Sequence, residues 1–165
     1  MPAANEDYIS ITESRVKELI EGIEAAGSQK YHVEKFFGTF DPNALYAFVQ
    51  NKLNTTNGSV FIRANDDDPE VQDTIGTLYK VRLPIECLVA YPAMKENQIN
   101  NNTRFTSEMM KDIRSALITQ RVNFSDQTKR IRYDGSASLF RDDQIDAQIV
   151  RFVLEGVVVD FNNSI

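Results

Sequence analysis

The residues of this chain that could most readily bind a ligand or take part in a reaction form an acidic run, Asp66-Asp67-Asp68-Pro69-Glu70, and Asp73 follows three residues later. Carboxylate oxygens in such a run could bind a hard cation and so support a metal-dependent hydrolase. The run lacks the spaced ligands and the central glycine of an EF-hand loop. Residues 65–76 contain no lysine or arginine to balance the acids. We therefore expect a solvated acidic loop instead of a metal site.

The side chains that most often serve as nucleophiles, bases and ligands are scarce. His32 is the only histidine, and we expect it to face solvent on a short strand. Cys87 is the only cysteine and falls on the apolar face of a predicted strand, which is typical of a buried, inert thiol. The chain contains no GxGxxG, no GxxxxGK[ST] and no Cys/His zinc spacing. The sequence predicts no enzyme, no cofactor and no bound metal.

Charge is distributed unevenly along the chain. Residues 1–76 carry 13 acids and 6 bases, a net charge of −7, whereas residues 77–165 carry 11 acids and 12 bases, a net charge of +1. The acidic balance argues against a general nucleic-acid binder, which would show a dominant basic stripe. Lys129, Arg130 and Arg132 form the densest basic group, next to Tyr133. We predict that this group lies on a surface or interface strand.

Length and composition predict one domain. At 165 residues and 42% hydrophobic content, the chain can bury a single sizeable core, which we place at residues 10–161 behind an N-terminal tail, residues 1–9. The first ten residues, MPAANEDYIS, lack the regions of a secretory signal, and no apolar run approaches the roughly 18 residues of a membrane span. We expect a protein kept in the cytosol, or in something assembled there, without membrane contact.

Two strand-like segments, residues 77–91 and 145–161, are unusually long. The first places one set of apolar residues on one face: Tyr79, Val81, Leu83, Ile85, Cys87, Val89 and Tyr91. Strict alternation predicts a half-buried strand, and at about 3.3 Å per residue it would reach about 50 Å, well beyond the usual strand of about 5 to 6 residues. Pro84 predicts an edge, a bulge or a bend, and a slip in the second alternation predicts a bulge near Gly156. Strands of this length point to assembly.

Helices are expected between these strands. Ser10 and Glu13 have the spacing of a capping box, and Gly27 is placed to end the helix that follows. A second helix opens at Asp41-Pro42, and a third spans residues 103–120. The expected core joins the two helices that have long apolar stripes to the first long strand: Val16, Ile20, Ile113 and Leu117 against Val81, Leu83, Ile85 and Val89.

Shorter strands complete the expected fold. They lie at residues 31–37, 60–64 and 129–134, and the last is closed by an Asp134-Gly135 turn. Residues 54–58 and 93–102 are polar and predict a turn and a loop. The predicted class is α+β, a mixed, mainly antiparallel sheet with two long strands, packed by two to three helices.

The order of these elements resembles the tail terminator family of long-tailed phages, particularly its Mu-like prophage branch. The resemblance is carried by the segments VFIRA, LYKVRLPIECLVAY, MMKDIRSALI and IVRFVLEGVVV and covers most of residues 10–161. It implies a six-membered ring that caps the tail tube, stops its polymerisation and joins the tail to the head connector. The partners would be further copies of the chain, the tail tube protein and, in addition, sheath and head-connector proteins. The protein would be located in the virion tail or neck, assembled in the host cytoplasm.

Within such a ring, we expect the acidic loop to face the channel and the basic group to lie at the interface between subunits. A channel lined by Asp66, Asp67, Asp68, Glu70 and Asp73 would let DNA pass without specific binding, because like charges repel the phosphates. Lys129, Arg130 and Arg132 would meet an acidic surface of the neighbouring subunit. Two other classes of function stay open from the sequence: a soluble adaptor that recruits a peptide to a sheet edge, and the metal-dependent hydrolase. Another neck or head-completion protein is the nearest alternative to a tail terminator.

Overall fold

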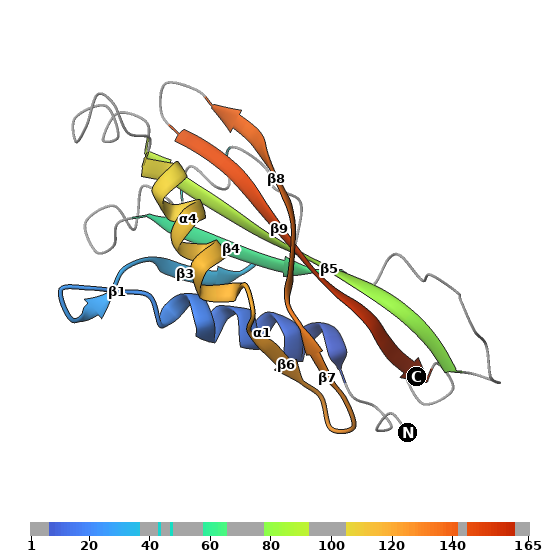
Figure 1. Cartoon of the computed structure of the whole chain (residues 1–165). Helices are drawn as coiled ribbons and strands as arrows, with labels where there is room; N and C mark the ends of the chain where they lie inside the picture. Colours follow the sequence, from blue (N-terminus) through green and yellow to red (C-terminus); the bar gives the residue numbers. More distant parts are fainter. Residues whose placement is uncertain are drawn as a thin grey trace.

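The computed structural model describes residues 7–36, 43, 47, 58–65, 78–92, 105–141 and 145–160. The strands of its central sheet are β3 (His32–Lys35), β4 (Ser59–Ala64), β5 (Leu78–Pro92), β8 (Arg132–Arg141) and β9 (Ile145–Asp160). They lie in the order β3-β4-β5-β9-β8 (Figure 1). β3 pairs with β4 in parallel, and the other three neighbouring pairs are antiparallel. The predicted mixed, mainly antiparallel sheet with two long strands is confirmed.

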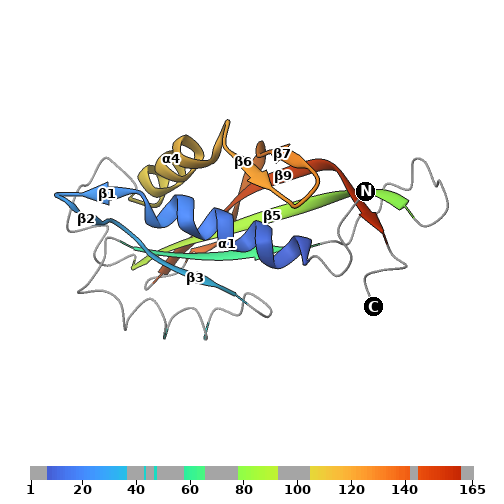
Figure 2. The ribbon, with the colours of Figure 1, turned by 90° about the horizontal axis from the view of Figure 1, so that it is seen from below.

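Helices and a small hairpin cover one face of this sheet. They are α1 (Tyr8–Glu21), α4 (Phe105–Leu117) and the hairpin of β6 (Arg121–Asn123) with β7 (Thr128–Arg130). Figure 2 shows all three on the same side of the sheet, which we call the helix face. A second hairpin, β1 (Glu24–Ala25) with β2 (Ser28–Gln29), follows α1. The predicted α+β class is confirmed.

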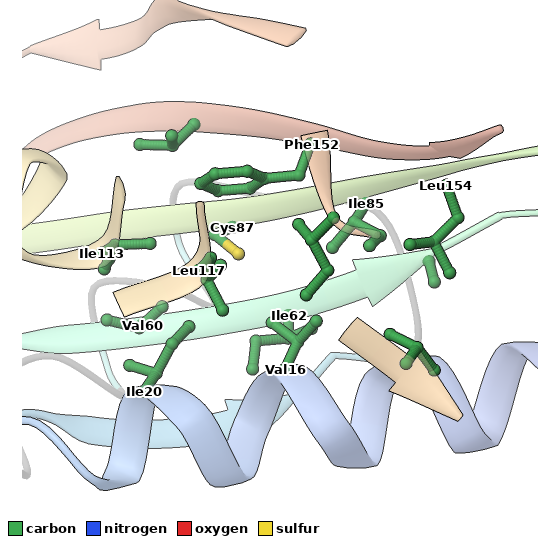
Figure 3. Close-up of a cluster of buried hydrophobic side chains, with 14 of the residues drawn as sticks. Val16, Ile20, Val60, Ile62, Ile85, Cys87, Ile113, Leu117, Phe152 and Leu154 are labelled. Carbon is green, nitrogen blue, oxygen red and sulfur yellow. The ribbon is translucent and has the colours of Figure 1, made fainter. Parts of the chain in front are cut away.

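The main core lies between the helices and the sheet. Every residue of the predicted core belongs to it and is no more than 3% exposed: Val16, Ile20, Val81, Leu83, Ile85, Val89, Ile113 and Leu117. Figure 3 shows Val16 and Ile20 of α1 and Ile113 and Leu117 of α4 directed at the strands. Full burial of such a side chain contributes about 1.5 to 3 kcal/mol. The spacing of apolar residues in the sequence therefore identified the face that each element buries.

The opposite face of the sheet is also buried over part of its length. A second apolar cluster lies there: Phe61, Leu88, Ala90, Ile145, Ala147 and Ile149, each no more than 4% exposed. The prediction of a half-buried strand is therefore wrong for the second half of β5, where Leu88 and Ala90 are buried as completely as their neighbours on the helix face. Alternation predicted the helix face correctly but could not show that the side chains of the other face are also buried here.

β5 and β9 pair along their whole length, from Leu78 opposite Asp160 to Pro92 opposite Ile145. The predicted bulge is confirmed, because the register shifts between Val81 and Leu83, opposite Gly156, whose φ is +68°. A backbone angle of this kind is accessible to glycine at little cost. The bulge returns Val157 to the buried helix face beside Leu154.

Pro84 predicted an edge, a bulge or a bend, and it lies in the central strand β5 at the place where its neighbour β4 ends. β4 ends with Ala64 opposite Ile85, and one further bond joins the Asn65 amide to the Pro84 carbonyl oxygen (3.0 Å). The missing N–H of Pro84 therefore falls at the point where the neighbouring strand stops, where its loss is least costly.

The start of α1 differs from the prediction. The N-cap is Asp7, whose Oδ1 accepts a hydrogen bond from the Ser10 amide (3.0 Å). Glu13, expected to complete a capping box, instead accepts from the amide of Ala64 at the end of β4 (3.1 Å). Tyr8, which we expected in the N-terminal tail, is helical and buried. A tertiary hydrogen bond thus replaces the local one that the spacing suggested.

The end of α1 also comes earlier than predicted. The helix ends at Glu21, with Gly22 as its C-cap. Ala26 and Gly27, with φ of 53° and 83°, instead form the two-residue turn between β1 and β2. Two successive residues with positive φ are what a type I′ hairpin turn requires.

The predicted strand 129–134 is wrong as a single element. Its residues are divided between β7, which ends at Arg130, and β8, which begins at Arg132. Asp134-Gly135 is not a turn but an irregularity inside β8, where the register shifts between Tyr133 and Ser136 and Gly135 has φ +103°. The helix predicted to open at Asp41-Pro42, the turn at residues 54–57 and the loops at residues 66–76 and 93–102 lie outside the described residues, apart from residues 43 and 47.

Candidate assembly surface

The structure divides the predicted basic group. Arg130 in β7 and Arg132 in β8 are exposed, whereas Lys129 lies on the same side of the hairpin as the buried Val122 and is only half-exposed. The Lys129 Nζ lies near Gly156, 3.9 Å from where a Cβ atom would be. Lys129 is therefore turned toward β9.

A fourth cation, Arg121, belongs to the exposed group and was missed by the sequence reasoning. Arg121 is the register partner of Arg130, and both are exposed on the outer face of the β6–β7 hairpin. Like charges directly opposite each other destabilise a strand pair. We call Arg121, Arg130 and Arg132 the basic hairpin surface. The short spacing between Asn123 and Thr128, typical of a hairpin, was the signal that could have revealed the pairing.

Few anions balance this surface. Arg132 Nη1 lies 3.6 Å from Glu155 Oε2, with both side chains more than half exposed, so the pair contributes little. Arg15 of α1 donates from Nε to the carbonyl oxygen of Arg121 (3.1 Å) and pairs with Glu18 (3.3 Å). The surface therefore keeps a net positive charge.

The β5–β9 pair continues past both of its neighbours. β8 reaches no further than Arg132, opposite Val153, and β4 no further than Ala64, opposite Ile85. We call residues 78–82 of β5 and 155–160 of β9 the arm. Figure 1 shows these two strand ends running together beyond the ends of β4 and β8.

β8 forms one edge of the sheet and carries exposed apolar side chains. Tyr133 is 41% and Leu139 is 37% exposed. Hydrogen bonds with Ser136 and Arg114 hold the pKa of Tyr133 below its usual value, and the Arg114 guanidinium lies 5.7 Å from the centre of the Tyr133 ring. β8 also has two register irregularities, the second between Ser138 and Phe140. Such irregularities protect an edge strand from unwanted pairing.

Charged residues cross the face of the sheet opposite the helices. Arg63 Nη2 bonds to Glu86 Oε1 (3.0 Å), and Arg151 is the register partner of Glu86 on the other side. Arg82 Nη2 bonds to Asp134 Oδ2 (3.0 Å). These pairs connect β4, β5 and β8, so they favour one arrangement of the sheet.

A polar cluster fixes α4 to the start of β3. The Asp112 Oδ2 accepts from Lys30 Nζ (2.8 Å) and from the buried Tyr31 hydroxyl (2.6 Å). Burial opposes ionisation of Asp112, but these two hydrogen bonds outweigh it and lower its pKa. Burial and the bond to Asp112 raise the pKa of Tyr31. A neutral tyrosine and an ionised aspartate are typical of a structural contact.

The two residues considered for catalysis have structural positions. His32 is not solvent-facing as predicted: its side chain is 19% exposed, and Nε2 lies 2.7 Å from Glu34 Oε1. Cys87 is fully buried, and burial raises the pKa of its thiol, as expected for an inert cysteine. Cys87 has neither the exposure nor the lowered pKa of a reactive thiol, and the His32 side chain is largely occupied by its contact with Glu34.

The acidic residues Asp66, Asp67, Asp68, Glu70 and Asp73 lie outside the described residues. Within the ranges that the structure describes, no three His, Cys, Asp or Glu side chains gather as a metal site would require. In the same part of the chain, none of the helices has the length and apolar character needed to cross a bilayer.

No protein-family model matches this chain, and no curated protein matches it in sequence.

Proposed function

We propose that this chain is a structural subunit of a phage virion, a tail terminator that forms a six-membered ring, caps the tail tube and joins the tail to the head connector. The order of elements in the sequence supports the family. The observation that carries the proposal is the arm, in which the ends of β5 and β9 extend beyond the ends of the neighbouring strands β4 and β8.

The arm is longer than a small domain needs. β5 has 15 residues and β9 has 16, whereas their neighbours β4 and β8 have 6 and 10. A typical strand has about 5 to 6 residues. Strand ends without neighbours expose backbone N–H and C=O groups, which are satisfied when another strand or subunit covers them. Association of copies through the arm would supply this cover.

A closed ring also needs two different surfaces on each subunit, because its joints are heterologous. The basic hairpin surface beside the arm supplies one of them. Residues 1–76, with their net charge of −7, supply acidic groups for the other. Exposed ion pairs contribute only about 0 to 1 kcal/mol each and are screened by salt, but the same pairs recur at every joint of a ring.

Reversing the basic hairpin surface tests this proposal. In the test variant, Glu replaces Arg121, Arg130 and Arg132. We expect this variant to fold normally but to form rings and cap tubes less well. High salt should partly reproduce the effect in the wild type. Light scattering would give the mass of the assembly, and electron microscopy the length of tubes grown with the tail tube protein.

A matched control changes Lys17, Lys111 and Arg141 to Glu. It reverses the same number of positive charges, but at positions away from the hairpin. Normal rings and normal tube lengths from the hairpin variant would remove the basic surface from the interface. A wild-type chain that stays monomeric at high concentration, alone and with tube protein, would overturn the ring itself.

A further inference from the structure

The two outer edges of the arm differ in the groups that cover them. On the β9 side, the carboxamide of Gln127 bonds to both backbone groups of Val158: Nε2 donates to the Val158 oxygen (2.8 Å), and Oε1 accepts from the Val158 amide (3.0 Å). A carboxamide carries the same donor and acceptor as a peptide group, so Gln127 takes the place of a strand residue there. The β9 edge of the arm is closed at Val158.

On the β5 side, the direction of the backbone groups follows from Pro84. Its carbonyl oxygen accepts from Asn65, so it points away from β9. N–H and C=O groups alternate in direction along a strand. The backbone groups of Arg82 and Lys80, two and four residues earlier, therefore also point away from β9. Among the residues that the structure describes, none hydrogen-bonds to the backbone of Lys80 or Arg82.

The side chains at this open edge determine which kind of strand can pair with it. Lys80 is exposed, and Arg82 lies on the same face of the sheet. Charged residues and proline at an edge discourage indiscriminate pairing. Arg82 already pairs with Asp134, so the charge at this edge that an incoming strand would meet is that of Lys80. A strand that carries a carboxylate opposite Lys80 would gain cross-strand attraction, while an apolar or basic strand would not.

We propose that the edge of β5 at Leu78, Lys80 and Arg82 receives an extended, acid-bearing strand from a second copy of this chain, and that Gln127 closes the opposite edge so that the arm accepts a strand on one side only. This inference rests on the ring proposed above and deepens it. A second copy fits because the first 76 residues of the chain supply the negative charge. One-sided addition gives a heterologous joint, which can close into a ring.

Lys80→Pro tests the open edge. The substitution removes an N–H that makes no bond within the described residues, and proline is tolerated at strand edges. We expect a folded monomer with a circular dichroism spectrum like that of the wild type, and association weakened about tenfold by light scattering. Lys80→Thr is the matched control, because it keeps the N–H while removing the charge, and it separates the backbone contribution from the electrostatic one.

Hydrogen exchange gives an independent readout at single residues. The Lys80 and Arg82 amides should exchange freely in the monomer and become protected on assembly, whereas the Val158 amide should be protected in both. Gln127→Ala should speed Val158 exchange about tenfold in the monomer, since a hydrogen bond is lost, and should produce larger, heterogeneous species through the newly opened edge.

The possible failures are distinguishable. Rings that form equally well from Lys80→Pro, or Lys80 and Arg82 amides that stay unprotected in wild-type rings, would overturn this inference and leave the ring standing. Unchanged Val158 exchange and unchanged assembly in Gln127→Ala would overturn the role of Gln127. Absence of any wild-type assembly would instead count against the proposed function.

Discussion

The two halves of the β5–β9 pair differ in how many of their faces are buried. In the half from Ile85 to Pro92, paired with residues 145–152, both faces are covered, and the residues that are not buried are the register partners Glu86 and Arg151. In the arm, Val81 and Val157 are buried on the helix face, while Lys80 is exposed on the other. One continuous strand pair is therefore core in one half and surface in the other.

This difference explains how a chain of 165 residues can carry strands of 15 and 16 residues. The doubly buried half supplies the apolar burial that stabilises the fold, so the arm is held in place without needing a second covering layer of its own. The arm is then available for contacts outside the subunit. Local stability should follow the same division, with the arm opening at a lower free energy than the core half.

The largest expected effect is the loss of unfolding free energy when a side chain is truncated in the doubly buried half of the β5–β9 pair, compared with the arm. Leu88→Ala, at a fully buried side chain, should lower the free energy of unfolding by about 2 to 5 kcal/mol, and Leu117→Ala in α4 by a similar amount. Val158→Ala in the arm, where the side chain is half-exposed, should cost less than about 1 kcal/mol. Urea unfolding would measure all three. Equal losses for Leu88→Ala and Val158→Ala would mean that the two halves do not differ.

The next effect concerns stability in acid and depends on Asp112, which fixes α4 to the start of β3. Because the pKa of Asp112 is lowered in the folded protein, its contribution is present above the unfolded pKa of about 3.9 and is lost as the pH falls through the folded value. Asp112→Asn should therefore cost about 1 to 3 kcal/mol near pH 7 and much less in acid, where the wild type has also lost the charge. A pH-independent difference in unfolding free energy between the two proteins would contradict this account.

A smaller effect, a gain in stability instead of a loss, is expected at Thr119, between α4 and the β6–β7 hairpin. Thr119 follows α4 with φ +79°, a left-handed conformation that a β-branched residue adopts only with strain. Thr119→Gly should raise the free energy of unfolding by about 0.5 to 1 kcal/mol, since glycine is relaxed there. Thr119→Ala provides the control, because it removes the branching but keeps the Cβ. A destabilised glycine variant would show that the Thr119 side chain makes a contact worth more than the strain.

The smallest effect is expected in the acidic run. Changing Asp66, Asp67 and Asp68 together to Asn should alter the free energy of unfolding by less than about 0.5 kcal/mol, as for most surface substitutions. Calcium, magnesium or manganese should not shift the melting temperature of either protein. A metal-dependent stabilisation of the wild type that the triple variant lacks would favour the hydrolase instead.

The sequence by itself determined the features that depend on neighbouring residues. The period of the apolar residues placed Val16, Ile113 and Leu83 in one core, and the slip in alternation located the bulge at Gly156. Pro84 predicted an edge, a bulge or a bend, and it lies where β4 ends. Each of these follows from backbone geometry within a few residues, because side-chain direction repeats with a period of 3.6 or 2.

Tertiary structure alone decided the partners of polar groups and the number of buried faces. Glu13 bonds to Ala64, 51 residues away, and Gln127 bonds to Val158, 31 residues away. Arg121 opposes Arg130 through a hairpin that was not predicted from the sequence, which suggested a single strand at residues 129–134. Local spacing cannot reveal such pairs, because a side-chain hydrogen bond depends on which distant backbone group the packed elements bring within about 3 Å. The same holds for Leu88: its place in the alternation predicted exposure, whereas in the folded protein it is fully buried in the second apolar cluster.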